Sequence, residues 1–398
     1  MKILHITTQK PNSTGSGIYL SEIISQAAKE NASQALVAGV DAKDSAHFPA
    51  GCDFYPVSFN TAKLPFNVVG MSDSMPYPAT KYSELTPVMA EKLEEAFLEV
   101  ISKVVENLDP DIIICHHLYL LTSIVREKFP ERKILAISHG SDLRQFQKTH
   151  LQRERIKRNI QNLDGIFALH IAQRDDIARI FDIPETKISI LGTGYNDEIF
   201  YDQKINRDSD LIKLIFAGKI SHKKGVYSLL KSLNSIVRCT NKPFKLYLAG
   251  GHSDREEYEE IMDLSGSLNF DHEFIGKITQ IELAEWFNKC HIMVLPSFFE
   301  GLPLVIIEAL ACKCGVVSTN LPGVQQWICE NIPTNNVVFV EPPEMENIDH
   351  PVKSSLKAFE ENLARALKHE IDNYKPADIN LSHVTWEKVY KRLINAVK

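Results

Sequence analysis

The chain has 398 residues, of which 44% are hydrophobic and 24% are charged. These proportions are close to the averages of soluble globular proteins, and they exclude the disordered, collagen-like and disulfide-scaffold classes. A chain of this length exceeds what one hydrophobic core usually serves, so we expect two domains of roughly 200 residues each. The net charge of -7 argues against a basic nucleic-acid-binding module, and we expect no nucleic-acid partner.

Cysteine spacing and apolar runs exclude further classes. The seven cysteines are scattered and lack paired C-x-x-C spacings, so neither a disulfide framework nor a zinc site is expected. The longest apolar runs, such as residues 112–115 and 304–307, are much shorter than the roughly 18 residues that span a bilayer. Residues 1–7 turn polar too early for a secretory signal. We therefore expect a cytoplasmic protein without a membrane span.

The first half of the chain alternates short β-branched runs with amphipathic segments, the pattern of a parallel sheet covered by helices. The pattern predicts strands at 2–8, 34–40, 111–116, 133–139 and 165–170, and helices at about 18–29, 89–108, 118–128 and 153–162. Residues 61–82 are rich in Pro, Ser and Asn. They should form a long loop of unassigned role, and loops of this length tend to be functional or mobile.

A second alternating series begins after the polar stretch 201–210, which we interpret as a linker. It predicts strands at 211–217, 245–249, 272–275, 291–295, 315–319 and 337–340, and helices at 226–237, 256–268 and about 304–313. The fold class is therefore α/β, with two Rossmann-like doubly wound domains at about 1–200 and 201–380. Ligands of such sheets bind outside the carboxyl ends of the strands, so two facing domains would enclose an interdomain cleft.

The most informative segment lies at 296–310, where a predicted strand ends in a turn containing Gly301 and Leu302. Pro303 should open a helix in its first turn, where its missing N–H does no harm. The free N–H groups of that turn could bind phosphate or sugar oxygens. Glu300 and Glu308, one turn into the helix, could bracket one bound molecule. Alternatively, Glu300 caps the helix and Glu308 is a solvated helix residue.

Glu300 and Glu308 are separated by seven residues that begin Gly301-Leu302-Pro303. This spacing resembles the paired-glutamate signature of retaining glycosyltransferases of the GT-B fold, in particular glycosyltransferase family 4 (glycosyl transferases group 1). The resemblance implies that Glu300 holds hydroxyls of the donor sugar and Glu308 the ribose hydroxyls of the nucleotide, since carboxylates accept paired hydrogen bonds. It also implies that the last helix, within about 381–398, returns to the first domain.

A cluster of lysines follows the first strand of the second domain. Lys219 and Lys224 stand between Gly218 and Gly225, where ammonium groups could stabilise a diphosphate leaving group or lie solvated in a surface turn. The segment resembles the family motif Gly-Arg-x-x-x-x-Lys-Gly. Lys224 matches the motif lysine, whereas Lys219 replaces the usual arginine with a point charge that lacks the planar fork. We expect both lysines to serve catalysis.

Two other glycine-containing turns match the family. Gly15, Ser16 and Gly17 join a strand to a helix, so their backbone could approach a phosphate, or they form a plain tight turn. No Gly-Lys-Ser/Thr follows, so this is not a Walker loop. The resemblance assigns these residues to the family's glycine-rich acceptor-side loop, where backbone groups could approach a phosphate or an acceptor, and we count them among the donor-binding residues.

The turn after the predicted strand 272–275 carries Gly276, Lys277 and Ile278. The resemblance places these residues where backbone groups bind the nucleobase. Backbone contacts have no side-chain code, so the identity of the base is not legible.

Histidines follow two predicted strands of the first domain. His139, before Gly140, is either a structural residue or, by its resemblance to the family's His-Gly motif, faces the donor sugar near the reacting carbon. Asp142 either caps the next helix or serves the acceptor side. His116 and His117 suit acceptor binding or a structural role.

The resemblance implies a retaining hexosyltransferase-type enzyme (EC 2.4) that moves a sugar from a nucleotide diphosphate donor, UDP being most common, to a hydroxyl acceptor by front-face displacement. No cofactor besides the nucleotide-sugar co-substrate is expected. A metal site is not expected either, although Asp208 and Asp210 have the spacing of a metal-binding Asp-x-Asp pair. The alternatives are a catalytically silent nucleotide-sugar-binding protein, or a glycoside hydrolase using Glu300 and Glu308. A lipid acceptor would imply peripheral membrane association.

Overall fold

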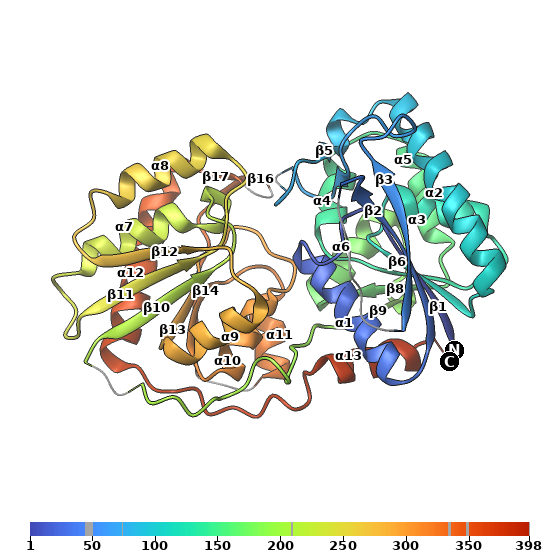
Figure 1. Cartoon of the computed structure of the whole chain (residues 1–398). Coiled ribbons are helices and arrows are strands. Elements are labelled where there is room, and N and C mark those ends of the chain that lie inside the picture. Colours follow the sequence, from blue (N-terminus) through green and yellow to red (C-terminus); the bar gives the residue numbers. More distant parts are fainter. Residues whose placement is uncertain (44–50, 74, 208–209, 333–335, 348–349, 398) are drawn as a thin grey trace. The chain divides into compact units, whose positions relative to one another are not determined.

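The computed structural model of the chain (Figure 1) describes residues 1–43, 51–73, 75–207, 210–332, 336–347 and 350–397. By internal contacts it divides into two compact units, Met1–Thr193 with Trp386–Lys398, and Gly194–Thr385. The expected cleft between the domains stays a prediction. Asp208, of the Asp-x-Asp lookalike, lies outside the described residues.

The first unit is built on a seven-stranded sheet, every strand of which is parallel to its neighbours. In sheet order the strands are β3 (Cys52–Phe59), β2 (Ser33–Asp41), β1 (Lys2–Thr7), β6 (Ile112–His116), β7 (Ile134–Ile137), β8 (Gly165–Ala168) and β9 (Ile188–Ile190). The central strands are buried along nearly their whole length, which explains why they lack a regular alternation of apolar and polar residues.

Helices cover both faces of this sheet. They are α1 (Gly15–Lys29), α2 (Pro87–Leu108), α3 (Leu120–Lys128), α4 (Ser141–Lys148), α5 (Arg153–Gln161), α6 (Ile171–Phe181) and α13 (Trp386–Asn395). On one face, Phe97 of α2 shares a large core with Leu4 of β1. On the other, Leu20 of α1 packs on Leu36 of β2.

The C-terminal helix α13 packs beside α1 in the first unit, as the fold class predicts (Figure 1). The rings of Tyr19 and Trp386 meet edge to face at 4.8 Å.

The predicted long loop 61–82 is mostly irregular in its described residues, with the two-residue strands β4 (Val69–Gly70) and β5 (Thr80–Lys81), and the 3-10 helix η1 (Tyr82–Glu84) follows it. Its Asp73 accepts hydrogen bonds from Gln145 Nε2 at 3.0 Å and from Lys148 Nζ at 3.1 Å. The loop is thereby attached to α4, the helix that was expected to open at Asp142.

The second unit has a six-stranded parallel sheet. In sheet order the strands are β12 (Asp271–Gly276), β11 (Phe244–Ala249), β10 (Ile212–Ala217), β13 (Ile292–Leu295), β14 (Gly315–Thr319) and β15 (Val337–Val340). A separate antiparallel pair is formed by β16 (Met345–Asn347) and β17 (His350–Pro351).

The helices of the second unit are α7 (Val226–Ile236), α8 (Arg255–Ser265), α9 (Gln280–Lys289), α10 (Leu304–Ala311), α11 (Val324–Asn331) and α12 (Leu356–Asn373). Leu229 of α7 and Leu363 of α12 share one core with Phe216 of β10. Arg207 donates to the backbone oxygens of Asn288 at 2.8 Å and Lys313 at 3.1 Å. Arg207, in the described part of the expected linker 201–210, is therefore hydrogen-bonded to the second unit.

In each sheet the strand order reverses beside the first strand of the unit. β1 lies between β2 and β6, and β10 lies between β11 and β13. Doubly wound sheets bind ligands outside the carboxyl ends of the strands at such switch points. The loops after β1, β6, β10 and β13 are therefore where each unit should bind a ligand, and these loops carry Lys219, Lys224 and Glu300 among the predicted site residues.

Candidate functional site

The loop after β10 carries the predicted diphosphate-binding lysines. It contains the 3-10 helix η3 (His222–Lys224) and passes into α7 through Gly225. Gly225 has a φ of 68°, and a Cβ atom there would overlap the carbonyl oxygen of Pro296. Only glycine therefore allows this turn to pack against the end of β13.

Lys224 and Glu300, predicted from separate motifs, are in direct contact. Lys224 Nζ donates to Glu300 Oε1 at 2.5 Å, and the two side chains are 26% and 15% exposed. A hydrogen bond between charged partners is stronger than one between neutral groups. The second unit thus brings one predicted cation and one predicted carboxylate together at the carboxyl ends of the neighbouring strands β10 and β13.

The segment from Glu300 to Glu308 departs from the expectation at Pro303. Pro303 is the N-cap residue with an extended backbone, and α10 begins at Leu304, so the predicted first-turn position is wrong by one residue. No side chain caps α10, which excludes a capping role for Glu300. Glu308 is only 6% exposed, which excludes a solvated helix position. The turn at Gly301 leads directly into the first N–H groups of α10.

Turns at the ends of β10, β11 and β12 are joined by backbone hydrogen bonds. Gly218 N donates to Ala249 O at 2.9 Å, and Gly250 N donates to Gly276 O at 2.8 Å. A Cβ atom at Gly250 would overlap the carbonyl oxygen of Gly218. Gly250 was missed, although the pair Gly250-Gly251 directly after a predicted strand was a readable signal.

The remaining predicted donor-side residues lie on these turns. Lys219 follows Gly218 and is half-buried. Gly276 has a φ of 74°. The side chain of Lys277 packs closely over Gly251, and a Cβ atom at Gly251 would overlap it. Lys277 is exposed and Ile278 half-buried. Their role in binding a nucleobase stays a prediction.

In the first unit, two of the predicted histidines are hydrogen-bonded to each other. His116 Nδ1 lies 3.2 Å from His139 Nε2, and the rings are stacked at 5.4 Å between centroids with 9° between their planes. His116 is the last residue of β6, and His139 follows β7, the next strand in the sheet. The sheet order therefore explains why residues 23 positions apart meet.

His117 lies beside this pair in an unusual backbone conformation. Its φ is 80°, which is uncommon for a residue with a Cβ atom. Its Nε2 lies 3.1 Å from Gln9 Nε2, and the same amide donates to Ser16 Oγ at 3.5 Å. Gln9, which the sequence pattern did not single out, thus connects the loop after β1 to the loop after β6.

The Asp142 side chain is buried and accepts hydrogen bonds from neighbouring loop residues. Its side chain is fully buried and accepts hydrogen bonds from Leu118 N at 2.7 Å, Ser138 Oγ at 3.1 Å and His139 N at 3.2 Å. The N-cap of α4 is Gly140, so Asp142 is not the cap residue. These contacts give Asp142 a structural function beside the predicted site.

Gly15, Ser16 and Gly17 form the first turn of α1 instead of the connection before it. Thr14 caps the helix by accepting from Gly17 N at 3.2 Å. This bond fixes the helix start three residues before the expected one. A Cβ atom at Gly17 would lie 2.8 Å from Asn12 N, whereas one at Gly15 would meet no atom within 4 Å. Gly17 therefore serves close packing, and the surface above Gly15 is open.

Burial determines the charge of the histidines. It lowers the pKa of His116 and of His139 well below the usual value, and the neighbouring histidines lower both pKa values further. Burial also lowers the pKa of His117, and it lowers the pKa of His5 to about 4. These imidazoles are therefore neutral at physiological pH.

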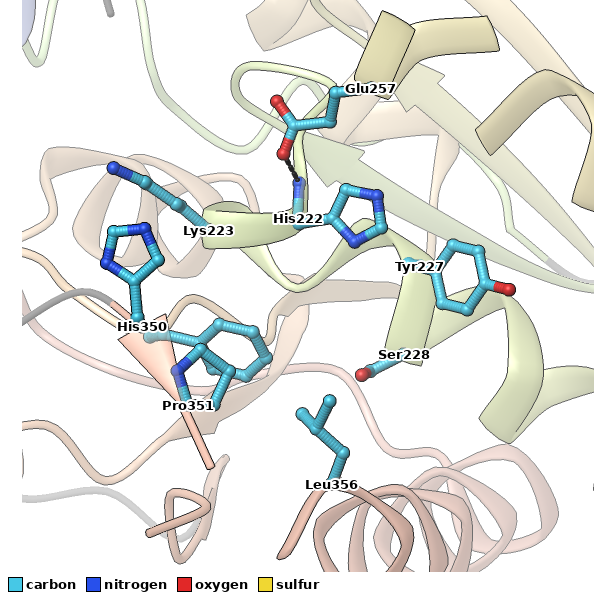
Figure 2. Close-up of a pocket in the computed structure, with 9 residues that line it drawn as sticks. His222, Lys223, Tyr227, Ser228, Glu257, His350, Pro351 and Leu356 are labelled. Carbon is cyan, nitrogen blue, oxygen red and sulfur yellow. Dashed lines mark hydrogen bonds between the residues drawn. The ribbon is translucent and has the colours of Figure 1, made fainter. Parts of the chain in front are cut away.

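A separate pocket of about 190 Å³ is lined in part by residues of η3 (Figure 2). Lys223 and His222 reach it from η3, and His350 from β17, while Glu257 accepts a hydrogen bond from His222 N. Lys223 thus lines this pocket, whereas its neighbour Lys224 binds Glu300.

The described part of the chain contains no group of three or more His, Cys, Asp or Glu side chains placed to hold a metal ion. Nor does any helix there have the length and apolar character needed to cross a bilayer.

Comparison with known proteins agrees with this geometry. Residues 197–376 match the family model described as glycosyl transferases group 1. An uncharacterized glycosyltransferase of Methanocaldococcus jannaschii is 23% identical over 240 residues, which are 56% of this chain and 57% of that protein. The chain thus spans less than two thirds of the length of this curated relative.

Solved structures match over the whole chain. Sucrose-phosphate synthase of Thermosynechococcus elongatus has a TM-score of 0.68 at 16% identity, covering 100% of this chain and 98% of that one. Anabaena HepE, solved in complex with UDP and glucose, has a TM-score of 0.63 at 14% identity, covering 100% and 99%. The chain therefore has the GT-B fold, and its second unit matches the glycosyl transferases group 1 over residues 197–376.

Proposed function

We propose that this chain is a retaining, metal-independent glycosyltransferase of family 4 that moves a sugar from a nucleotide diphosphate sugar to a hydroxyl acceptor. UDP is the proposed nucleotide. The observation that supports this most is the Lys224–Glu300 pair at the switch point of the second unit, within the segment that matches the glycosyl transferases group 1.

Charge around the departing diphosphate is the proposed source of catalysis. Lys224, Lys219 and the N–H groups that open α10 would stabilise the negative charge that develops as the bond from the sugar breaks. Glu300, beside Lys224, would accept hydrogen bonds from hydroxyls of the transferred sugar. Cations on both sides of the diphosphate would do the work that a metal ion does in other transferases.

The nucleotide would be held deeper in the second unit. Glu308 is buried one turn into α10, and its two carboxylate oxygens suit the vicinal hydroxyls of a ribose. The backbone of Gly276, Lys277 and Ile278 would contact the base, and the joined turns at Gly218 and Gly250 would form the floor below it.

Front-face displacement is the proposed route. The bond from the anomeric carbon to the diphosphate oxygen breaks, and the acceptor oxygen attacks the same face of the sugar. The acceptor hydroxyl loses its proton to the departing diphosphate. His139 would contact the donor sugar, and His116 and His117 would lie on the acceptor side in the first unit. Cytoplasmic location and membrane association through a lipid acceptor stay predictions.

A glycoside hydrolase is the weaker alternative. Its acid catalyst must hold a proton to give to the leaving group, yet Glu300 Oε1 accepts a hydrogen bond from Lys224. A hydrolase would also have no use for the lysine cluster.

Labelled nucleotide sugars test the proposal. Purified protein should release a nucleoside diphosphate only when a hydroxyl acceptor is present, and the label should move to that acceptor. Hydrolysis of simple glycosides without nucleotide would favour the hydrolase. Donor binding without transfer across a broad acceptor panel would favour a catalytically silent binding protein. A thermal-shift screen of nucleoside diphosphates comes first, because a bound ligand stabilises the folded state.

A further inference from the structure

Tyr19 of α1 packs against the ring of His139. The two ring centroids are 5.2 Å apart, with 75° between the ring planes, an edge-to-face arrangement in which aromatic rings attract each other. Tyr19 is only 2% exposed, and it lies about one turn after Gly15, where α1 begins. A side chain from the first turns of α1 therefore contacts one of the predicted site residues, although no predicted motif includes it.

His139 has other ring neighbours as well. Its Nε2 lies 3.2 Å from His116 Nδ1, and the two rings are stacked. The His117 ring lies 4.9 Å away, with 57° between the planes. The last side-chain torsion of histidine has a broad energy minimum, so the groups packed against the ring decide where it points. Tyr19 is the ring neighbour that meets His139 edge to face.

Tyr19 is itself fixed at two further points. Its hydroxyl donates to the backbone oxygen of Gly192 at 3.1 Å, and its ring meets the Trp386 ring at 4.8 Å with 80° between the planes. Phenylalanine would fill nearly the same space without a buried hydroxyl that needs a hydrogen-bond partner. A role in filling the core therefore does not account for the hydroxyl of Tyr19.

The backbone that accepts this hydrogen bond is held on both sides. Leu191 N, next to Gly192, donates to Ala168 O at 2.8 Å. Leu191 O accepts from Arg392 Nε of α13 at 3.0 Å. The Gly192 oxygen is thus a fixed anchor for the Tyr19 hydroxyl.

Both partners of Tyr19 lie where the chain leaves or re-enters the first unit. This unit ends at Thr193 and resumes at Trp386, so Gly192 comes just before the first connection and Trp386 just after the second. We propose that Tyr19 is a positioning residue for His139, and that it ties the position of His139 to these two connections. A displacement of Gly192 or of Trp386 reaches His139 through one buried side chain.

The consequence for catalysis rests on the proposed function, in which His139 contacts the donor sugar. Tyr19 would touch neither donor nor acceptor and would act only through His139. UDP lacks the transferred sugar, so its affinity should not depend on Tyr19. The affinity for UDP-glucose and the turnover number should depend on it.

Histidine NMR of the full-length protein tests the link without ligand or turnover. The imidazole signals of His139 are identified by their loss in His139→Asn. Tyr19→Phe keeps an aromatic ring beside His139 and removes only the bond to Gly192, and it should shift these signals. Tyr82→Phe is the matched control, because it removes a buried hydroxyl from a ring that contacts Tyr119 instead. Signals that Tyr19→Phe leaves unchanged, or shifts no more than Tyr82→Phe does, would overturn the proposal.

The second connection is tested from Trp386. Trp386→Leu removes the ring that packs on Tyr19 and should shift the same His139 signals, whereas Trp386→Phe keeps a ring and should shift them less. Phe181→Leu, at a fully buried position whose ring contacts Phe146, controls for a general loss of stability. His139 signals that respond as strongly to Phe181→Leu as to Trp386→Leu would contradict this connection.

A double-mutant cycle with His139→Ala separates positioning from a merely structural role. With UDP-glucose as donor, Tyr19→Leu should lower kcat by about a hundredfold, the order of loss that a misplacement of about 1 Å causes, and Tyr19→Phe should lower it less. In the His139→Ala background neither substitution should lower kcat further, because Tyr19 acts only through His139. A full effect in that background would refute positioning, and so would an equal loss of affinity for UDP and for UDP-glucose.

The NMR and turnover measurements fail independently. If the His139 signals respond as expected and no nucleotide sugar binds, Tyr19 remains the positioning residue of His139 and the proposed function fails. If UDP-glucose is a substrate and Tyr19→Phe leaves the His139 signals unchanged, the proposed function stands and the positioning role fails. Tyr19→Phe alone decides the matter if Tyr19→Leu does not fold.

Discussion

Acidification should unfold the first unit by protonating histidines that are neutral when folded, and His5 is the clearest case. Its side chain is fully buried, and burial lowers its pKa from 6.5 to about 4 despite the hydrogen bond to Gln34. Between these two values the unfolded chain binds a proton that the folded chain does not. The free energy of unfolding must therefore decrease as the pH falls through this window.

The size of the effect follows from the pKa difference. A difference of about 2.5 pKa units at about 1.36 kcal/mol per unit gives a loss of about 3 kcal/mol between pH 7 and about pH 4. Burial lowers the pKa values of His116 and His139 in the same direction. The total decrease in the free energy of unfolding of the wild type should thus exceed the decrease due to His5. The decrease due to His5 alone is already a large part of the stability of a typical domain.

Urea unfolding at several pH values measures this loss. Trp386 reports on the first unit, and replacing Trp286 and Trp327 of the second unit with Phe leaves it as the only tryptophan. In His5→Leu, the free energy of unfolding should depend less steeply on pH near pH 5, because about one proton fewer is taken up on unfolding. His150→Leu, at an exposed position of the same unit, is the matched control. Equal pH slopes for His5→Leu and the wild type would refute the reasoning.

Three further predictions concern the donor side and the turns. Lys224→Ala should lower turnover by about a hundredfold, whereas Lys223→Ala, which removes the same charge from a residue that lines the separate pocket, should leave the initial rate near the wild-type value. Glu308→Ala should weaken UDP binding in calorimetry. Gly225→Ala should lower the free energy of unfolding by more than about 1 kcal/mol, because its φ is 68° and a Cβ atom would overlap a carbonyl oxygen. Gly15→Ala, where a Cβ atom meets nothing within 4 Å, should not.

These predictions fail in distinguishable ways. Equal rates for the two lysine variants would remove Lys224 from the mechanism, and an unchanged UDP affinity would contradict the assignment of Glu308 to the ribose. Urea unfolding that does not separate the two glycine variants would show that the turn at Gly225 can relax.

The central strands could be predicted almost to the residue because they are buried on both faces. The expected strand 315–319 is β14, and the expected 211–217 begins one residue before β10. The missed strand β3 is different. It lies at the sheet edge, carries Pro56 and is half-exposed along most of its length, so it lacks the continuous apolar run. The start of α4 was expected at Asp142, but its N-cap residue is Gly140, which has no capping side chain that could mark the start in the sequence.

The site could be predicted only where one short segment carries the information. The glycine, lysine and glutamate motifs of the second unit are local in sequence, and Lys224 and Glu300 proved to be in contact. Gln9, Tyr19 and His5 carry no such local signal. Their contacts join residues as far apart as Tyr19 and Gly192, whose oxygen accepts from the Tyr19 hydroxyl at 3.1 Å. Contacts of this kind depend on strand order, which a single sequence does not state.

The two switch points use opposite electrostatics, and this difference bears on what each can bind. At the switch of the second unit, Lys224 and Glu300 are charged groups joined at 2.5 Å and still partly exposed, so they can exchange their mutual bond for bonds to a charged, polyhydroxylated ligand. At the switch of the first unit, burial keeps His116 and His139 neutral. A neutral imidazole carries one donor and one acceptor nitrogen but no charge, so it can bind hydroxyl groups without adding charge attraction to a phosphate. The charge of the donor would therefore be recognised by the second unit, whereas the first unit would contribute neutral hydrogen-bonding groups.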